Sequence, residues 1–335
     1  MNTIKRLTAL ILVLLVGCAP QAPPATDDNN DPDLIKVAFA RIPAKNEWES
    51  AFNRSFDNTF TAADGFLLLQ ECHAAFNPLA PDAVQCFIDQ GMQYLLAPTM
   101  FARHEDFIAA LRVANDAGIP VIIVGSDYDL IDEDLYIAAI ASDYYRQGRL
   151  ATLWLSGYLR ARERHNEDMH IAFIGGDFLT HFPGTNRSMR AYALLNPTWP
   201  NDNRNILESV EGFDSMPLGE EEMSYFIETY PEVNAVYIEC GMTALGAVDA
   251  IKAAGKIPGE DIIVMTFGGD HWALRSIIQR GLTMAVAVNP MYGPKAREII
   301  EKLERGETVE KVYYLQDKVI DLDAVADMLP ATAFG

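Results

Sequence analysis

The stretch AVYIECGMTALGAVDAIKAAGKIPGEDIIVMTFGG, residues 235–269, shows how this chain folds. The short apolar run 235–239, rich in branched and aromatic side chains, predicts a buried strand. Apolar residues then recur at helical spacing over 242–254, and the helix is expected to end at Gly255. A second apolar run, 262–267, predicts another strand, so the stretch is a strand–helix–strand unit of a parallel sheet.

The same alternation extends over most of the chain. Further strands are predicted at 35–41, 66–70, 94–97, 121–124, 136–141, 170–174 and 284–288. Helical periodicity occurs between the strands, at 48–61, 82–90, 105–116, 146–164 and 294–304. This order predicts an α/β protein whose parallel sheets carry helices on both faces.

So many strands exceed what one such sheet usually contains, and the segment 142–149 marks the passage from a first unit to a second. We therefore predict two Rossmann-like lobes joined by a hinge. Their boundaries are 34–140 plus 289–318 for the first lobe, and 141–288 plus 319–335 for the second. Ligands of open parallel sheets bind beyond the carboxyl ends of the strands, so we expect a ligand cleft between the lobes.

Composition excludes several classes of protein. Half of the 335 residues are apolar, which excludes an intrinsically disordered chain. Lys and Arg number 26 against 47 Asp and Glu, and the resulting net charge of -21 repels phosphate backbones. Nucleic acid is therefore not an expected partner.

The N-terminus has the layout of an export signal. Lys5 and Arg6 precede the apolar run 7–16, which is too short to span a bilayer. The run ends at Leu-Val-Gly-Cys, which is similar to the bacterial lipoprotein signal, so residues 1–17 are expected to be removed and Cys18 to carry the lipid. The alternative is an ordinary cleavage site with Cys18 as one of its small residues. We expect a protein anchored in the periplasm or on the cell surface, which contacts the membrane only through its lipid.

Residues 18–33 are rich in Pro, Asp and Asn, which predicts a flexible tether. Export places the remaining thiols in an oxidising compartment. Cys72 ends a predicted strand and Cys86 lies in the next predicted helix, so the two either form a disulfide or are buried free thiols. Cys240 is the odd cysteine.

Motifs of catalysis are missing from the sequence. No predicted strand is followed by a Gly-rich phosphate fingerprint, and no GxSxG nucleophile elbow occurs. The six His form no HExxH motif and none has a Cys at zinc-site spacing. We therefore predict no catalytic residue, no metal and no cofactor.

Residues 235–269 and their continuation 273–296 resemble the second-lobe signature of the type I periplasmic sugar-binding proteins of ABC importers, a family that includes ribose and galactofuranose binders. The segments 118–126, 135–155 and 171–192 are similar to the hinge and second-lobe entry of that family. The resemblance implies two lobes that close on a sugar like a Venus flytrap.

Within this resemblance, Trp48 and Phe213 match aromatic clamps for the apolar faces of a sugar, and Arg187 matches an arginine that grips a ligand oxygen. Without it, they would be interpreted as a core Trp, a packed loop Phe and a surface Arg. Asp143 is expected beside the hinge.

The polar half of the site departs from the family pattern. Residues that differ from the usual acids, amides and arginine are Gly125, Ser126, Cys240, Gly241, Gly268 and Val288. Unpaired ligand hydroxyls would cost about 1 to 3 kcal/mol each. Either the neighbours Asp127, Glu239 and Asn289 replace these groups, or the ligand differs.

The resemblance implies a solute-binding lipoprotein that delivers a small sugar-like ligand to the membrane permease of an ABC importer. A second resemblance is shorter: the periplasmic autoinducer-2 receptor also has a Cys-containing loop before Ala-Leu-Gly-Ala-Val-Asp-Ala, and a glycine-rich turn after the next strand. It implies the alternative of a receptor that signals to a membrane sensor kinase.

Overall fold

The computed structural model describes residues 33–44, 46–70, 79–99, 104–125, 128–164, 169–175, 206–210, 215–269 and 271–328. The chain divides into the units 1–32 and 33–335. The predicted signal peptide and nearly all of the predicted tether, with Cys18, lie outside the described residues. Within the described part, no helix is long and apolar enough to cross a membrane.

Six strands form the first sheet, in the order β11-β5-β4-β3-β1-β2. Their bounds are β1 Ile35–Phe39, β2 Phe66–Leu69, β3 Tyr94–Pro98, β4 Val121–Val124, β5 Ala138–Ser142 and β11 Val312–Leu315. All of these strands run parallel.

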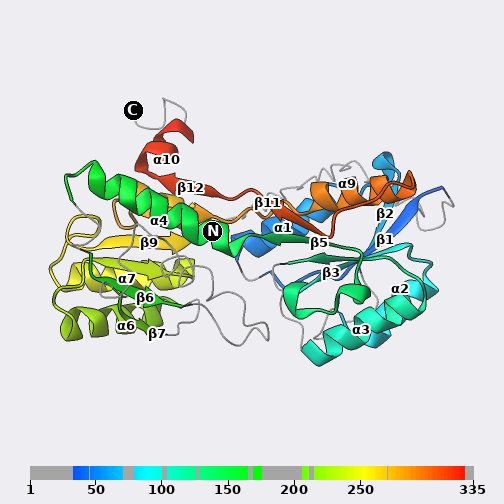
Figure 1. The fold of residues 1–335 in the computed structure, drawn as a ribbon, viewed down its shortest axis with the longest axis horizontal. Helices are drawn as coiled ribbons and strands as arrows, with labels where there is room; N and C mark the ends of the chain where they lie inside the picture. The colour runs from blue at the N-terminus through cyan, green and yellow to red at the C-terminus, as the bar shows by residue number, and fades with distance from the viewer. Residues whose placement is uncertain are drawn as a thin grey trace, which may run out of the picture. The chain divides into compact units, whose positions relative to one another are not determined.

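Helices cover both faces of the first sheet (Figure 1). They are α1 Glu47–Asp57, α2 Pro81–Asp89, α3 His104–Asp116 and α9 Gly293–Glu304. Successive side chains of a strand point to opposite faces, so Val37 and Phe39 of β1 pack with α1 and α9, while Ala38 packs with α2 and α3. The short 3₁₀ helices Ala62–Asp64, Tyr128–Leu130 and Glu133–Leu135 lie in the connections.

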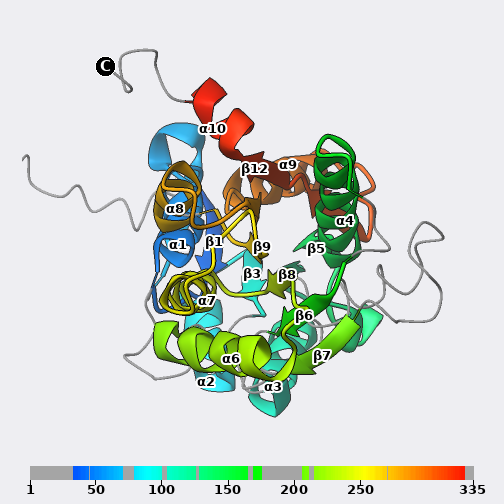
Figure 2. The same ribbon diagram turned by 90° about the vertical axis from the view of Figure 1, so that its left-hand side faces the viewer.

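The second sheet repeats this arrangement, in the order β12-β10-β9-β8-β6-β7. Its strands are β6 Ile171–Ile174, β7 Ile206–Val210, β8 Ala235–Ile238, β9 Ile263–Phe267, β10 Met284–Ala287 and β12 Lys318–Asp321. The helices around it are α4 Tyr144–Arg160, α6 Met216–Thr229, α7 Gly241–Ala253, α8 His271–Ile278 and α10 Leu322–Met328. Helix α4 packs on one face of the sheet, and the other four pack on the opposite face (Figure 2).

The α/β fold with two sheets is confirmed, and the sheets are parallel as predicted except at one edge. Strand β12 runs antiparallel to β10. The chain passes from β11 into β12 through residues 316–317 alone, without the helical crossover that a parallel partner requires. The chain therefore enters the second sheet at the carboxyl edge of that sheet, and β12 runs antiparallel to the other strands. The predicted lobe boundaries, which include residues outside the described ranges, stay a prediction.

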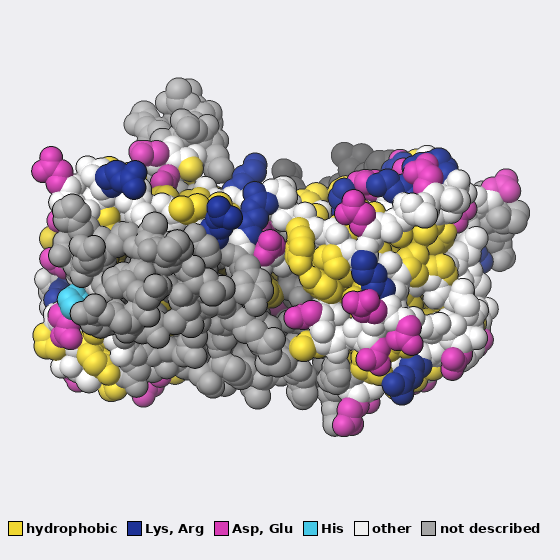
Figure 3. Space-filling view, viewed as in Figure 1, with side chains coloured by type: hydrophobic (Ala, Val, Ile, Leu, Met, Phe, Trp, Pro, Cys, Tyr) yellow, Lys and Arg dark blue, Asp and Glu magenta, His cyan; other side chains and the backbone are white. Residues whose placement is uncertain are grey.

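Helix α9 carries both basic and acidic side chains on its surface. On α9, Lys295 and Lys302 both pair with Glu298, and Arg297 pairs with Glu301. Basic and acidic side chains lie next to one another in this region (Figure 3). Such pairs between neighbouring helical turns each add a few tenths of a kcal/mol, about 0.3 to 0.5.

Candidate functional site

The strand orders place the site of this fold. In the first sheet the order reverses between β1 and β3, and in the second between β6 and β8. Ligands of open parallel sheets bind beyond the carboxyl ends of the strands at such a reversal. The residues that follow these strands, together with the helix after β1, therefore make up the candidate site.

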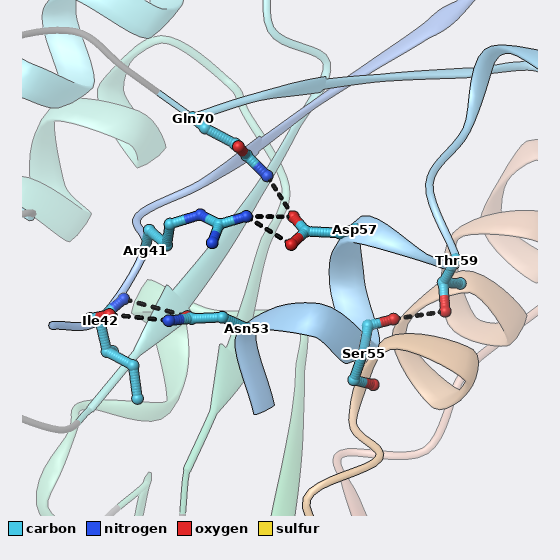
Figure 4. Close-up of polar contacts among 7 residues, drawn as sticks. All are labelled: Arg41, Ile42, Asn53, Ser55, Asp57, Thr59 and Gln70. Carbon is cyan, nitrogen blue, oxygen red and sulfur yellow. Dashed lines mark hydrogen bonds and ion pairs between the residues drawn. The ribbon is translucent and has the colours of Figure 1, made fainter. Parts of the chain in front are cut away.

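A set of polar contacts holds α1 against the end of β1 (Figure 4). The Asn53 side chain donates to the Ile42 carbonyl at 2.8 Å and accepts from the Ile42 N–H at 3.3 Å. The Asp57 carboxylate pairs with Arg41 after β1 and accepts from Gln70 Nε2, after β2, at 2.6 Å. These bonds fix the position of the helix at the carboxyl edge of the sheet.

The first turn of α1 is built by a capping box. The Asn46 side chain accepts from the Glu49 N–H at 2.9 Å, and the Glu49 carboxylate accepts from the Asn46 N–H at 3.2 Å. Two amides that a helix start leaves unpaired are thereby satisfied. The cap begins the helix at Glu47, so Glu47 and Trp48 lie in its first turn.

Trp48 has one side packed and its polar edge bonded. Its ring stacks on Phe52 at 5.4 Å between centroids, and Tyr292 meets it edge-on at 6.3 Å. Its Nε1 donates to the carbonyl of Val288, which follows β10 of the second sheet, at 3.0 Å. The half-buried indole therefore joins the core of the first sheet to the chain that leaves the second.

Glu47, beside Trp48, forms a second link to the other sheet. Its carboxylate pairs with the imidazole of His271, the first residue of α8, and accepts the His271 backbone N–H at 3.0 Å. These hydrogen bonds from His271 lower the pKa of Glu47. Both side chains are about half exposed, 50% and 51%, so the pair is a surface contact.

The second sheet contributes residues that follow β8. Glu239 comes directly after this strand and is half-buried, and its N–H donates to the Ile174 carbonyl at 3.0 Å. Cys240 is the N-cap residue of α7 and is not disulfide-bonded. Glu239 therefore lies at the predicted edge of the sheet.

Glycines after β4 and β9 explain part of the departure from the family pattern. A side chain at Gly125 would bring its Cβ within 1.9 Å of the Thr99 hydroxyl, and the φ of +155° favours glycine. Gly268 has a φ of +119° with open space where a Cβ would lie. At Gly269, the Cβ would come within 2.5 Å of Ala287. Packing therefore disfavours a side chain at 125 and 269, and the backbone conformation disfavours one at 125 and 268.

Thr99, which follows β3, is a residue that the sequence reasoning did not single out. It is fully buried, and its hydroxyl has no hydrogen-bond partner in the described structure. A buried hydroxyl is normally paired, so this one is an unsatisfied group at the carboxyl edge of the first sheet. No sequence pattern marks it, because its burial depends on tertiary packing.

Two predicted residues lie at the connections between the sheets. The Asp143 carboxylate accepts from the Arg146 N–H at 2.9 Å and caps α4. The Asn289 side chain accepts from the Met291 N–H at 2.9 Å and donates to the Gln316 carbonyl at 3.4 Å. Asn289 therefore contacts a second connection between the sheets, whereas the Asp143 bond is a cap within α4.

Several predicted residues lie outside the described ranges, namely Asp127, Arg187, Phe213 and Cys72. Cys86 is disulfide-bonded. Since Cys240 is not disulfide-bonded, Cys86 pairs with a cysteine outside the described ranges, and Cys72 as its partner stays a prediction.

No group of His, Cys, Asp or Glu in the described part of the chain is arranged to hold a metal ion. A cavity of about 370 Å³ lies at the opposite end of the second sheet, between the C-terminal part of α4 and the loop before β9. Trp154, Tyr158 and Arg280 contribute to its lining. It is separate from the carboxyl edges.

The fold and the position of the site define a two-sheet binding protein, and comparison with known proteins gives its family. Residues 37–307 match the periplasmic binding protein domain, so this chain belongs to that family. The resemblance stated from the sequence is thereby confirmed.

Two curated relatives show what this chain is similar to. The galactofuranose-binding protein of Escherichia coli is 25% identical over 248 residues, 73% of this chain and 74% of the relative. The ribose import binding protein of Bacillus subtilis is 26% identical over 230 residues, 68% of each chain. Both are binding proteins and not enzymes, as predicted for this chain.

Among solved structures, a protein of Mycobacterium smegmatis in complex with β-D-fucofuranose has a TM-score of 0.68 to this fold. It is 22% identical, and the match covers 90% of this chain and 95% of that one. This likeness confirms the α/β architecture.

Proposed function

We propose that this chain is an exported, lipid-anchored binding protein that closes on a sugar in its furanose form and delivers it to the permease of an ABC importer. The observation that carries the proposal is the family match over residues 37–307, and relatives that bind galactofuranose and ribose support the ligand class. The lipid anchor at Cys18 rests on the signal sequence.

In this proposal, Trp48 stacks on the ligand from the first lobe. The described contacts occupy one face of the indole, through Phe52, and an edge, through Tyr292 and Val288. Among the described residues, no ring contact occupies the second face, which in this proposal covers the apolar C–H surface of a sugar ring.

Glu239 supplies a carboxylate from the edge of the second sheet, which can accept two hydroxyl hydrogen bonds. Arg187, Phe213 and Asp127 complete the proposed contacts. In this proposal, Asp143 and Asn289 contact the ligand from the hinge side of the cleft. Gly268 leaves open space where the resemblance implies a larger polar side chain, whereas a side chain at Gly125 would clash with Thr99.

The test is a thermal-shift panel on the mature chain after unfolding and refolding to remove any carried ligand. The panel contains D-galactose, L-arabinose, D-ribose and D-fructose, which equilibrate with furanose forms. Methyl galactopyranoside is the matched control, because it cannot open to a furanose. A sugar at about 100 times its dissociation constant adds about 2.7 kcal/mol of apparent stability.

Stabilisation by a free sugar but not by the locked pyranoside supports the furanose site. Equal stabilisation by both would contradict it. The alternative, a receptor that signals to a membrane sensor kinase, rests on the loop around Cys240 and the turn at Gly268. A response to autoinducer-2 alone, with or without borate, would favour this alternative.

A further inference from the structure

Three connecting segments join the two sheets. The chain crosses from β5 into α4 at 142–143, from β10 into α9 at 288–292, and from β11 into β12 at 316–317. Any rotation of one lobe against the other must be taken up by these segments, because the sheets and helices are packed bodies.

One carboxylate, in the third segment, bonds to both of the others. Asp317 Oδ1 accepts the backbone N–H of Asn289, in the second segment, at 2.9 Å. Asp317 Oδ2 accepts from Gln147 Nε2 at 2.8 Å, and Gln147 lies in the first turn of α4, directly after the first segment. Asp317 is 6% exposed and Gln147 only 2%, so water does not compete for these bonds.

The neighbouring residue repeats the pattern near the surface. The Gln316 side chain accepts from Arg146 at the start of α4, and the Gln316 carbonyl accepts from Asn289 Nδ2 at 3.4 Å. Ser142 and Tyr292 add a direct hydroxyl contact between the first two segments at 3.3 Å. The connecting segments are therefore bonded to one another as well as to their own sheets.

The hydrogen bonds of Asp317 partly offset the cost of burying its carboxylate. Burial raises its pKa, while the bonds from Asn289 and Gln147 and the charge of Arg146 act in the opposite direction. Arg146 and Asp143, both at the start of α4, are the charged groups that act on it. A buried carboxylate is costly unless it is well bonded, and its value lies in the geometry that it specifies.

We propose that Asp317 is the positioning residue of the hinge: its carboxylate holds the three connecting segments together as one pivot about which the lobes open and close. The effect on ligand affinity rests on the proposed function, whereas the pivot itself does not.

The experiment measures amide hydrogen exchange at Asn289 in the ligand-free mature chain by NMR. Asp317→Ala removes the acceptor of this N–H, so the Asn289 protection factor should fall by about tenfold or more. Asp317→Asn keeps the shape, with its oxygen accepting from Asn289 and its amide donating to a flipped Gln147. Its protection factor should stay within about threefold of the wild type.

A pH series separates the pivot from a general structural role. In the wild type, burial raises the pKa of Asp317, so protonation favours the buried arrangement, and the Asn289 protection factor should rise as the pH falls. Asp317→Asn should show no such rise. Equal acid sensitivity of the two proteins would overturn the role of the carboxylate.

Asp321 is the matched control. Like Asp317, Asp321 accepts one side-chain N–H and one backbone N–H. The side-chain donor is the indole of Trp154 at 2.8 Å, and the backbone donor is Ala324 at 3.0 Å. Neither of these two bonds reaches a connecting segment. Asp321→Ala should lower the unfolding temperature and leave Asn289 protection unchanged, so an equal loss of protection in both variants would refute the pivot.

A second arm measures L-arabinose affinity. If the wild type binds, Asp317→Ala should bind about fivefold to tenfold more weakly, because closure must then order a loosened hinge. If the wild type does not bind, the furanose proposal fails for this sugar, and hydrogen exchange still decides the pivot.

Discussion

Replacement of Trp48 gives the sharpest separation between a ligand clamp and a core residue. Trp48→Phe keeps an aromatic ring against Phe52 but removes the N–H that Val288 accepts at 3.0 Å. One such hydrogen bond contributes about 1 kcal/mol net, so the free energy of unfolding should fall by about this amount.

Trp48→Ala also loses the ring contacts with Phe52 and Tyr292, each of which contributes about 0.5 to 1.5 kcal/mol beyond area burial. Large aromatic deletions from cores cost about 3 to 5 kcal/mol. Because Trp48 is only half-buried, we expect about 3 kcal/mol. Urea unfolding of the ligand-free protein measures both variants.

Ligand binding is the second measurement. If the free face of the indole stacks on a sugar, Trp48→Ala should weaken binding about tenfold or more, by titration calorimetry with a sugar that the wild type binds. Trp48→Phe should bind within about threefold of the wild type, because it keeps an aromatic face.

Trp154 is the matched control for this pair of variants. It also donates its N–H to an acceptor, Asp321, and stacks on a second ring, Tyr158, at 4.7 Å, but it lies on α4 away from the carboxyl edges. Trp154→Ala should lose comparable stability and keep its affinity. Wild-type affinity in Trp48→Ala would refute the clamp, and Trp48 would then be a core residue.

Three further predictions follow from single contacts. Gly246→Ala should lower the free energy of unfolding by about 3 kcal/mol in urea, because its Cβ would lie 1.9 Å from the Met216 carbonyl of the neighbouring helix; a loss below about 1 kcal/mol would contradict this packing. Glu47→Gln should weaken sugar binding by at most about fivefold with unchanged thermal stability, since its half-exposed pair with His271 joins the two lobes; tighter binding would show that the pair opposes closure. For Asp317 the folded pKa is raised, so its stabilising contribution is present below the unfolded pKa and is lost as pH rises through the folded pKa. The unfolding free energy of Asp317→Asn relative to the wild type should therefore rise between pH 4 and pH 8, and a flat difference would show that the carboxylate is not desolvated.

Local sequence patterns were sufficient to predict most of the architecture. The apolar runs at 121–124 and 235–239 are strands because branched side chains buried on both faces leave a continuous apolar signature. Strands β7 and β12 carry Glu, Ser, Lys or Asp within four or five residues, and at the edges of a sheet such polar residues are tolerated. Their sequences therefore resemble loops and do not predict strands; the apolar strand β11 is not among the predicted strands either.

For the site, too, the local sequence predicts some features, whereas others depend on the tertiary structure. The sequence by itself determined that Trp48 opens a helix, that Glu239 ends a strand, and that ligands of this fold bind where such strands end. Only the tertiary structure decided that the indole of Trp48 reaches Val288, and that Asp317 joins the segments containing Gln147 and Asn289. Periodicity reports burial within one element, whereas these bonds link residues far apart in the chain, and their geometry depends on the packing of both sheets.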